Sequence, residues 1–138
     1  MEGIIFTERL ILKLQKRDVD LIHVLKEAVF KNLAIVFMTK DVNRFCGLPI
    51  FDGRIKFKNI CMFKAYSGKK ISVRELSEVL KKIGPAESML FVSSDEKDYK
   101  VAASQGMGFV LYSVSDRHRK MPYQTIDRIT ILFESLEN

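Results

Sequence analysis

We expect an α/β fold with a mostly parallel, five-stranded sheet that is covered by helices on both faces. Short apolar runs alternate along the chain with segments whose apolar residues recur every three or four positions. The runs are nearly continuous, which is typical of strands that are buried on both faces of a parallel sheet. With 138 residues and 47% hydrophobic content, the chain is long enough for one core, and we expect a single domain over residues 1–138.

Five apolar runs and four helical patterns predict the elements. The strands are expected at residues 3–6, 33–38, 60–63, 89–92 and 109–112. The helices are expected at residues 18–32, 73–83, 95–105 and 123–136. The helix over 73–83 has the clearest boundaries, because Ser72 and Glu75 form the pattern of a capping box and Gly84 with Pro85 ends the apolar periodicity.

Polar residues follow several of the predicted strands, where ligands bind in open parallel sheets. Thr7 follows the first strand, Thr39 the second, and residues 93–98 the fourth. The sequence lacks the complete P-loop pattern, a glycine-rich dinucleotide turn after the first strand, and a recognisable set of zinc ligands. We therefore expect none of these three sites.

The positive charge is concentrated in one stretch of the chain. Basic residues outnumber acidic ones by 23 to 17, which gives a net charge of +6. Residues 54–70 hold basic residues and no acidic one, and they account for this whole excess. Such a local field attracts phosphates or acidic protein surfaces, although a solvated basic edge without a partner has the same pattern.

The apolar runs are too short for a membrane span. The longest strongly apolar runs fall far below the ~18 residues that a membrane helix needs. Glu2, Glu8 and Arg9 interrupt the N-terminal apolar residues, in contrast to a signal peptide. We therefore expect a cytoplasmic protein with no membrane partner.

Two segments resemble the haloacid dehalogenase-like (HAD) superfamily. Residues 80–107, with Met-Leu-Phe-Val-Ser-Ser-Asp-Glu-Lys-Asp at 89–98, are similar to the C-terminal half of HAD phosphatases. Residues 66–71 are similar to the cap-less magnesium-dependent branch of that superfamily. The resemblance implies a three-layer, Rossmann-like α/β/α fold without a cap domain.

The chain departs from the family at the residues that carry the chemistry. In HAD phosphatases the first strand ends in Asp-x-Asp, whose first Asp attacks phosphorus and whose second is the general acid and base. Thr7 and Arg9 stand at these two positions. A Thr hydroxyl is a weak nucleophile without an adjacent base, and a permanently charged Arg carries no proton. Strand alternation would direct Glu8 to the opposite side from Thr7, so we do not expect it to substitute.

The other motif positions are partly kept. Thr39 and Lys70 match the family residues that bind the phosphoryl group, although an ordinary turn residue and an ordinary surface residue would fit these positions as well. In the metal motif Ser94 replaces a carboxylate while Asp98 remains, which is a weak remnant of a magnesium site. We therefore expect no catalytic residue and no cofactor, with magnesium only if the chain is a phosphatase.

These observations favour a catalytically inactive HAD-like protein that acts as a basic binding module. Dense Lys and Arg on loops suit the phosphates of RNA, so we expect docking on a ribonucleoprotein such as the ribosome. The expected RNA-binding residues are Arg54, Lys56, Lys58, Lys64, Lys69, Arg117, Arg119 and Lys120. Two alternatives stay open: an active magnesium-dependent HAD phosphatase, and a protein-protein adaptor whose basic patch meets an acidic partner.

Overall fold

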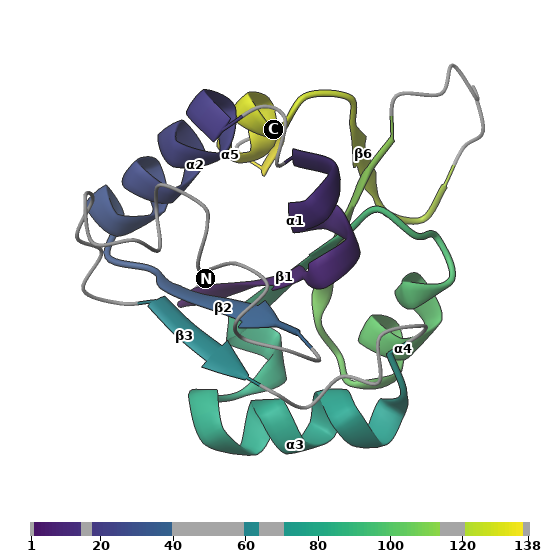
Figure 1. Cartoon of the computed structure of the whole chain (residues 1–138). Helices are drawn as coiled ribbons and strands as arrows, with labels where there is room; N and C mark the ends of the chain where they lie inside the picture. The colour runs from purple at the N-terminus through teal and green to yellow at the C-terminus, as the bar shows by residue number, and fades with distance from the viewer. Residues whose placement is uncertain (1, 15–17, 40–59, 64–70, 114–120, 137–138) are drawn as a thin grey trace.

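In the part of the chain that the structure describes, six parallel strands form one sheet between two layers of helices (Figure 1). The computed structural model describes residues 2–14, 18–39, 60–63, 71–113 and 121–136. The strands are β1 (Gly3–Thr7), β2 (Ala34–Met38), β3 (Ile60–Phe63), β4 (Met89–Ser93), β5 (Gly108–Tyr112) and β6 (Gln124–Ile126). Their order across the sheet is β3-β2-β1-β4-β5-β6.

The helices of the described residues divide between the two faces of the sheet. They are α1 (Glu8–Leu14), α2 (Asp18–Phe30), α3 (Val73–Ile83), α4 (Asp98–Ser104) and α5 (Leu132–Leu136). Helices α1, α2 and α5 cover one face, and α3 and α4 cover the other (Figure 1). Two short 3₁₀ turns, η3 (Ala86–Ser88) and η4 (Ile129–Ile131), precede β4 and α5.

The strand order reverses direction between β1 and β4. The chain begins in the middle of the sheet at β1, builds outward to β2 and β3, and then returns to place β4 on the other side of β1. It then builds outward again to β5 and β6. Connections leave β1 and β4 in opposite directions, so the carboxyl ends of these two strands border the crevice in which such sheets bind ligands.

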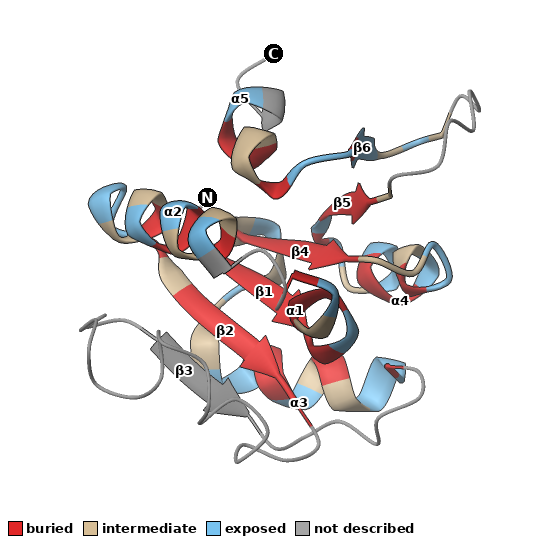
Figure 2. Ribbon diagram, turned by 45° about the horizontal axis from the view of Figure 1, so that its top comes forward, coloured by how far each residue is buried: buried red, intermediate tan, exposed pale blue. Residues whose placement is uncertain are grey.

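The central strands are buried on both faces (Figure 2). Successive side chains of a strand point to opposite faces, so Phe6 packs into the core beneath α1 and α2 while Ile5 packs into the core beneath α3 and α4. Phe6 stacks on Phe37 with ring centroids 5.7 Å apart. This two-sided burial explains the continuous apolar runs in the sequence and makes the sheet a fixed support for the residues at its ends.

The predicted parallel sheet and its five strands are confirmed, and so are the helices predicted over 18–32, 73–83 and 95–105, with ends that differ by a few residues. The capping box at the start of α3 is present, because Ser72 accepts the Glu75 N–H and the Glu75 side chain accepts the Ser72 N–H. Gly84 follows the helix with φ 131°, a conformation that favours glycine. In the described ranges, no helix is long and apolar enough to cross a membrane.

Two parts of the prediction need correction. The predicted helix over 123–136 is wrong in its first half: residues Gln124–Ile126 form β6, which extends the sheet along β5, and α5 begins only at Leu132. Hydrogen bonding to the open edge of β5 outweighs a weak helical pattern there. Helix α1 was not expected from the sequence, because this seven-residue helix follows β1 without a turn to mark its start.

Candidate functional site

Buried polar side chains gather at one edge of the sheet. Among the described residues they are Thr7, Glu8, Thr39, Ser93 and Asp98. All of them lie at the carboxyl ends of the neighbouring strands β2, β1 and β4, or on the first residue of the helix that follows. Burying a polar group costs free energy unless it is hydrogen-bonded, so their concentration at this edge marks it as the candidate site.

Glu8 lies inside this cluster. Its carboxylate accepts a hydrogen bond of 2.8 Å from the Thr39 hydroxyl. The expectation that Glu8 points away from the site is wrong, because β1 ends at Thr7 and helix α1 begins at Glu8, so strand alternation no longer applies. Thr7 serves the helix instead: its hydroxyl lies 3.4 Å from the Leu10 N–H, in the position of a helix cap.

A second pair of buried groups shapes the loop after β4. The Ser93 hydroxyl donates a hydrogen bond of 2.6 Å to the Asp98 carboxylate and accepts one of 3.0 Å from the Asp95 N–H. The Asp95 carboxylate accepts the Lys97 N–H at 3.0 Å. These bonds set the path of residues 93–98 and direct the Asp95 side chain toward α1.

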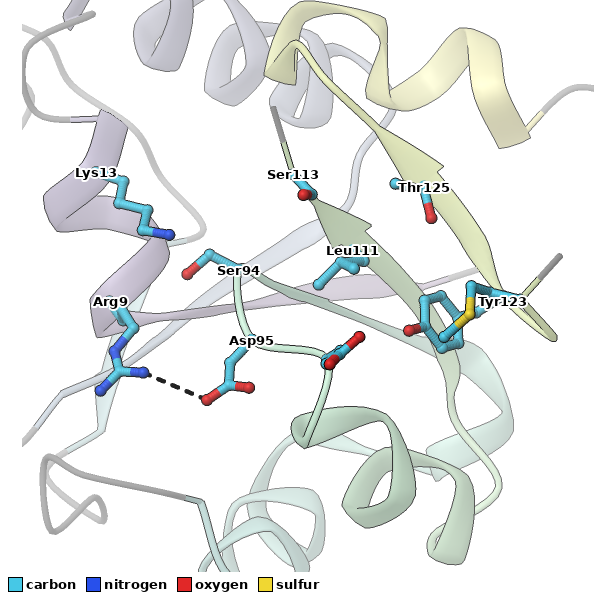
Figure 3. Close-up of a pocket in the computed structure, with 10 residues that line it drawn as sticks. Arg9, Lys13, Ser94, Asp95, Leu111, Ser113, Tyr123 and Thr125 are labelled. Carbon is cyan, nitrogen blue, oxygen red and sulfur yellow. Dashed lines mark hydrogen bonds and ion pairs between the residues drawn. The ribbon is translucent and has the colours of Figure 1, made fainter. Parts of the chain in front are cut away.

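One ion pair joins the two halves of the site. The Arg9 guanidinium on α1 lies 3.3 Å from the Asp95 carboxylate (Figure 3). The Arg9 side chain is half exposed and that of Asp95 is 23% exposed, so the pair is accessible to solvent and to a ligand. Such an exposed pair contributes little stability, and its importance is that it places both charges at the same opening.

A cavity of about 310 Å³ opens beside this ion pair. It is lined by Arg9, Lys13, Ser94, Asp95, Glu96, Leu111, Ser113, Met121, Tyr123 and Thr125. Arg9 and Lys13 lie on one side and Tyr123 on the other (Figure 3). Ligand pockets start at about 300 Å³, so the volume suits a small organic ligand.

Two hydroxyl groups of the cavity lining are buried without a partner. The Ser94 Oγ and the Tyr123 hydroxyl make no hydrogen bond within the part of the chain that the structure describes. Burial, the negative charge of Glu96 and the neighbouring Tyr99 raise the pKa of Tyr123, in that order of size. The Tyr123 hydroxyl therefore stays protonated in neutral solution and is able to donate a hydrogen bond to a ligand.

The described residues do not fit a protein-held magnesium site. Across the described ranges, no three His, Cys, Asp or Glu side chains come together as metal ligands. Ser94 occupies the position of a metal-binding carboxylate in the resemblance, Asp98 accepts the Ser93 hydroxyl, and Asp95 pairs with Arg9. Magnesium needs an octahedron of oxygen ligands in which carboxylates supply the charge.

The structure brings five of the predicted positions to this edge, namely Thr7, Arg9, Thr39, Ser94 and Asp98. The remaining predicted positions lie outside the described residues: Lys70 and the expected RNA-binding residues Arg54, Lys56, Lys58, Lys64, Lys69, Arg117, Arg119 and Lys120.

Three residues of the cavity, Lys13, Asp95 and Tyr123, were not expected from the sequence. The spacing of Arg9 and Lys13, four residues apart, would have indicated a shared helix face had α1 been recognised. Asp95 lies inside the polar segment 93–98 that the analysis had singled out. No signal marks Tyr123, because it reaches the cavity only through the placement of β6.

Comparison with known proteins identifies the fold. No family model matches the chain, and no curated protein matches its sequence. CbbY from Rhodobacter sphaeroides, solved in complex with phosphate, is similar in structure with a TM-score of 0.60 and 17% identity over 83% of this chain and 56% of that chain. A haloacid dehalogenase-like family hydrolase from Xanthomonas campestris has a TM-score of 0.61 and 14% identity over 86% of this chain and 52% of that chain.

A HAD-superfamily hydrolase of subfamily IA from Geobacter sulfurreducens is similar with a TM-score of 0.52 and 22% identity over 81% of this chain and 54% of that chain. The chain thus has a HAD-like fold and spans about half the length of the solved structures it matches.

These similarities correct one expectation. Two of the three structures are hydrolases and the third was solved with phosphate. The expectation of a catalytically inactive protein, drawn from the changed motif residues, is contradicted by this comparison, because the structures that share the fold include hydrolases. The absence of a cap domain stays a prediction from the sequence.

The Thr39 hydroxyl supports the buried Glu8 carboxylate, so its removal will weaken the fold at this edge. We expect Thr39→Val to lower the free energy of unfolding by about 2 kcal/mol, measured by urea denaturation, because a buried charged group loses a hydrogen bond. Thr125→Val, the same change at an exposed position, is the control and is expected to stay within about 0.5 kcal/mol. Equal effects at the two positions would contradict this role of Thr39.

Tyr123 holds its proton to higher pH in the folded chain than in the unfolded chain. Its contribution to stability is therefore complete below the ordinary tyrosine pKa of about 10, and the free energy of unfolding falls as pH rises above that value. We expect the tyrosinate absorbance difference between the wild type and Tyr123→Phe to have its midpoint above pH ~10. A midpoint below that value would show that the hydroxyl is not shielded.

Proposed function

We propose that the chain is a hydrolase of phosphate esters that acts in the cavity beside the Arg9–Asp95 ion pair. The observation that carries this proposal is the placement of Arg9, Lys13 and Asp95 on one cavity, next to the buried polar cluster at the carboxyl edge of a HAD-like sheet. The likeness to hydrolases and to a phosphate-bound structure supports it.

The cations of α1 would bind the phosphoryl group. Arg9 and Lys13 are one helical turn apart and both line the cavity. An Arg guanidinium presents parallel N–H donors that match two phosphate oxygens, and a Lys ammonium adds a compact charge. The Ser94 hydroxyl, which has no partner in the described part of the chain, adds a donor from the carboxyl end of the neighbouring strand β4. Together they provide a cationic cradle for a phosphate dianion.

Asp95 is the residue to which we assign the general base. In hydrolysis a water molecule attacks phosphorus, the bond between phosphorus and the leaving oxygen breaks, and the attacking water loses a proton. Asp95 lines the cavity beside the cations of α1, and its carboxylate would accept this proton. The leaving oxygen takes a proton from solvent, so the products are an alcohol and inorganic phosphate.

The buried polar residues at the carboxyl edge of the sheet position the residues that line the cavity. Thr7 caps α1. The hydroxyl groups of Thr39 and Ser93 donate hydrogen bonds to the side chains of Glu8 and Asp98, respectively. These side chains are at most 5% exposed, so they are poorly placed to meet a substrate in the cavity. Their role in the proposed mechanism is to position Arg9 at the start of α1 and Asp95 in the loop after β4.

The assignment of Asp95 predicts a large and specific loss of activity. We expect Asp95→Asn to lower kcat for p-nitrophenyl phosphate by about 100-fold, the size of effect typical of a lost general base. Release of inorganic phosphate is the measurement. Asp127→Asn, the same substitution at an exposed aspartate outside the cavity, is the matched control and should keep the wild-type rate.

Three results would overturn this mechanism. A wild-type protein that releases no phosphate from any ester rejects the proposed function. A fully active Asp95→Asn variant rejects the assignment of the base. Activity that is lost in EDTA and restored by magnesium rejects a mechanism carried by Asp95 and the cations of α1 alone.

Docking on RNA is a second candidate function, and the basic run over residues 54–70 is the observation that favours it. We expect the protein in native lysate to sediment with ribonucleoprotein particles at low salt and to be released at high salt, because phosphate contacts release counterions. Nuclease treatment separates the two kinds of partner, since it frees an RNA-bound protein and leaves a protein-bound one in its complex. Sedimentation as a free protein at low salt would contradict RNA docking.

A further inference from the structure

A second cavity of about 430 Å³ adjoins the first. It is lined by Glu96, Lys97, Tyr99, Lys100, Val101, Met121, Pro122 and Tyr123. Glu96, Met121 and Tyr123 line both cavities, so they form the wall that the two share. The Tyr123 ring is thus at the centre of a larger ligand-accessible region.

Neighbouring rings hold Tyr123 in place. Its centroid lies 4.6 Å from that of Tyr99 on α4 and 5.0 Å from that of Phe109 on β5. The Phe109 ring is nearly perpendicular to it, at 80°, and also contacts Tyr99 edge-on. Edge-to-face and tilted contacts of this kind stabilise aromatic clusters, so Tyr123 is a rigid surface before any ligand arrives.

The two sides of the first cavity differ in chemistry. Arg9 and Lys13 are cationic and lie across the cavity from Tyr123 (Figure 3). The rest of the lining combines the apolar side chains of Leu111 and Met121 with the polar groups of Glu96, Ser113 and Thr125. A phosphoryl group held by the cations would fill only part of a space of about 310 Å³. The rest of the space is therefore suited to the organic part of the ester.

The Tyr123 hydroxyl is a hydrogen-bond donor that a ligand on this side of the cavity would need to satisfy. It is buried and makes no hydrogen bond to any described residue. A buried donor without a partner costs free energy, and a ligand atom that accepts its hydrogen would recover that cost. The organic group that fits is therefore one that presents an apolar surface to Leu111, Met121 and Tyr123 and carries a hydrogen-bond acceptor.

We propose that the substrate is a phosphate ester whose organic part contains a planar aromatic ring with a hydrogen-bond acceptor, bound against Tyr123. This inference rests on the proposed function and names the class of substrate for the same site. The ring packs on the aromatic wall, the acceptor meets the Tyr123 hydroxyl, and the phosphoryl group lies against Arg9 and Lys13. Esters of flexible polyols lack the flat surface that this wall matches.

Phosphonates test this inference without turnover, because the hydrolysis of an ester does not cleave their carbon–phosphorus bond. The probes are cyclohexylphosphonate, phenylphosphonate and 4-nitrophenylphosphonate, measured by isothermal titration calorimetry. We expect phenylphosphonate to bind about 10-fold more tightly than cyclohexylphosphonate, in the range of ring stacking on an aromatic side chain. The nitro oxygens should add about 3-fold or more through the Tyr123 hydroxyl.

Variants of Tyr123 separate the ring from the hydroxyl. Tyr123→Phe should keep the preference for phenylphosphonate and lose the gain from the nitro group. Tyr123→Leu should lose both, while the affinity for inorganic phosphate stays unchanged. Tyr112→Phe is the matched control, because Tyr112 is buried in the core on the other face of the sheet and lines neither cavity.

The outcomes distinguish this inference from the proposed function. Equal affinity for the cyclohexyl and phenyl probes in the wild type overturns the aromatic subsite, even if Tyr123→Leu fails to fold. Hydrolysis of aryl and alkyl phosphate esters with equal kcat/KM also overturns the aromatic subsite. If phenylphosphonate binds more tightly than cyclohexylphosphonate but phenyl phosphate is not hydrolysed, the proposed function is overturned and the aromatic subsite is supported. Absence of binding by all three probes overturns both.

Discussion

A parallel sheet that is buried on both faces can carry polar chemistry only where its strands end. Strand β1 has apolar neighbours above and below, and β2 and β4 on either side. A charged side chain within it would lose hydration without gaining a partner. The polar groups of the core are therefore displaced to the carboxyl ends, where Glu8 pairs with Thr39 and Asp98 with Ser93. The rest of the site depends on these two buried pairs.

The short helix α1 places charged side chains at the opening of the cavity beside this edge of the sheet. Because α1 begins directly after β1, its first turn presents one side chain inward and the next outward. Glu8 enters the buried cluster, and Arg9 reaches Asp95 in the loop after β4. Lys13 then follows on the same face. The seven-residue helix α1 thus supplies both the buried Glu8 and the cations Arg9 and Lys13. It begins at the carboxyl end of β1, next to β4, where the chain changes the direction in which it adds strands to the sheet.

The sequence could predict the interior of this fold better than its edges. Continuous apolar runs identify the central strands, because two-sided burial leaves no polar alternation, and the capping box of Ser72 marks the start of α3. The positions of Thr7 and Thr39 follow from the ends of their strands. The inward direction of Glu8 could not be predicted, since it depends on where β1 turns into α1. Neither could the role of Tyr123, because two of the three residues of β6 are exposed and give little pattern.

Tyr123 directly precedes β6, the least anchored strand of the sheet that the structure describes. Strand β6 has three residues and pairs with β5 alone, whereas β1 and β4 each have neighbours on both sides. Short edge segments open locally at a fraction of the free energy of global unfolding. The two sides of the cavity therefore differ in how they are anchored: Arg9 and Lys13 lie on the helix that follows the central strand β1, and Tyr123 lies beside the edge strand β6. A ligand that contacts both sides would link this short edge strand to the centre of the sheet, and its binding would stabilise β6 as well as the fold as a whole.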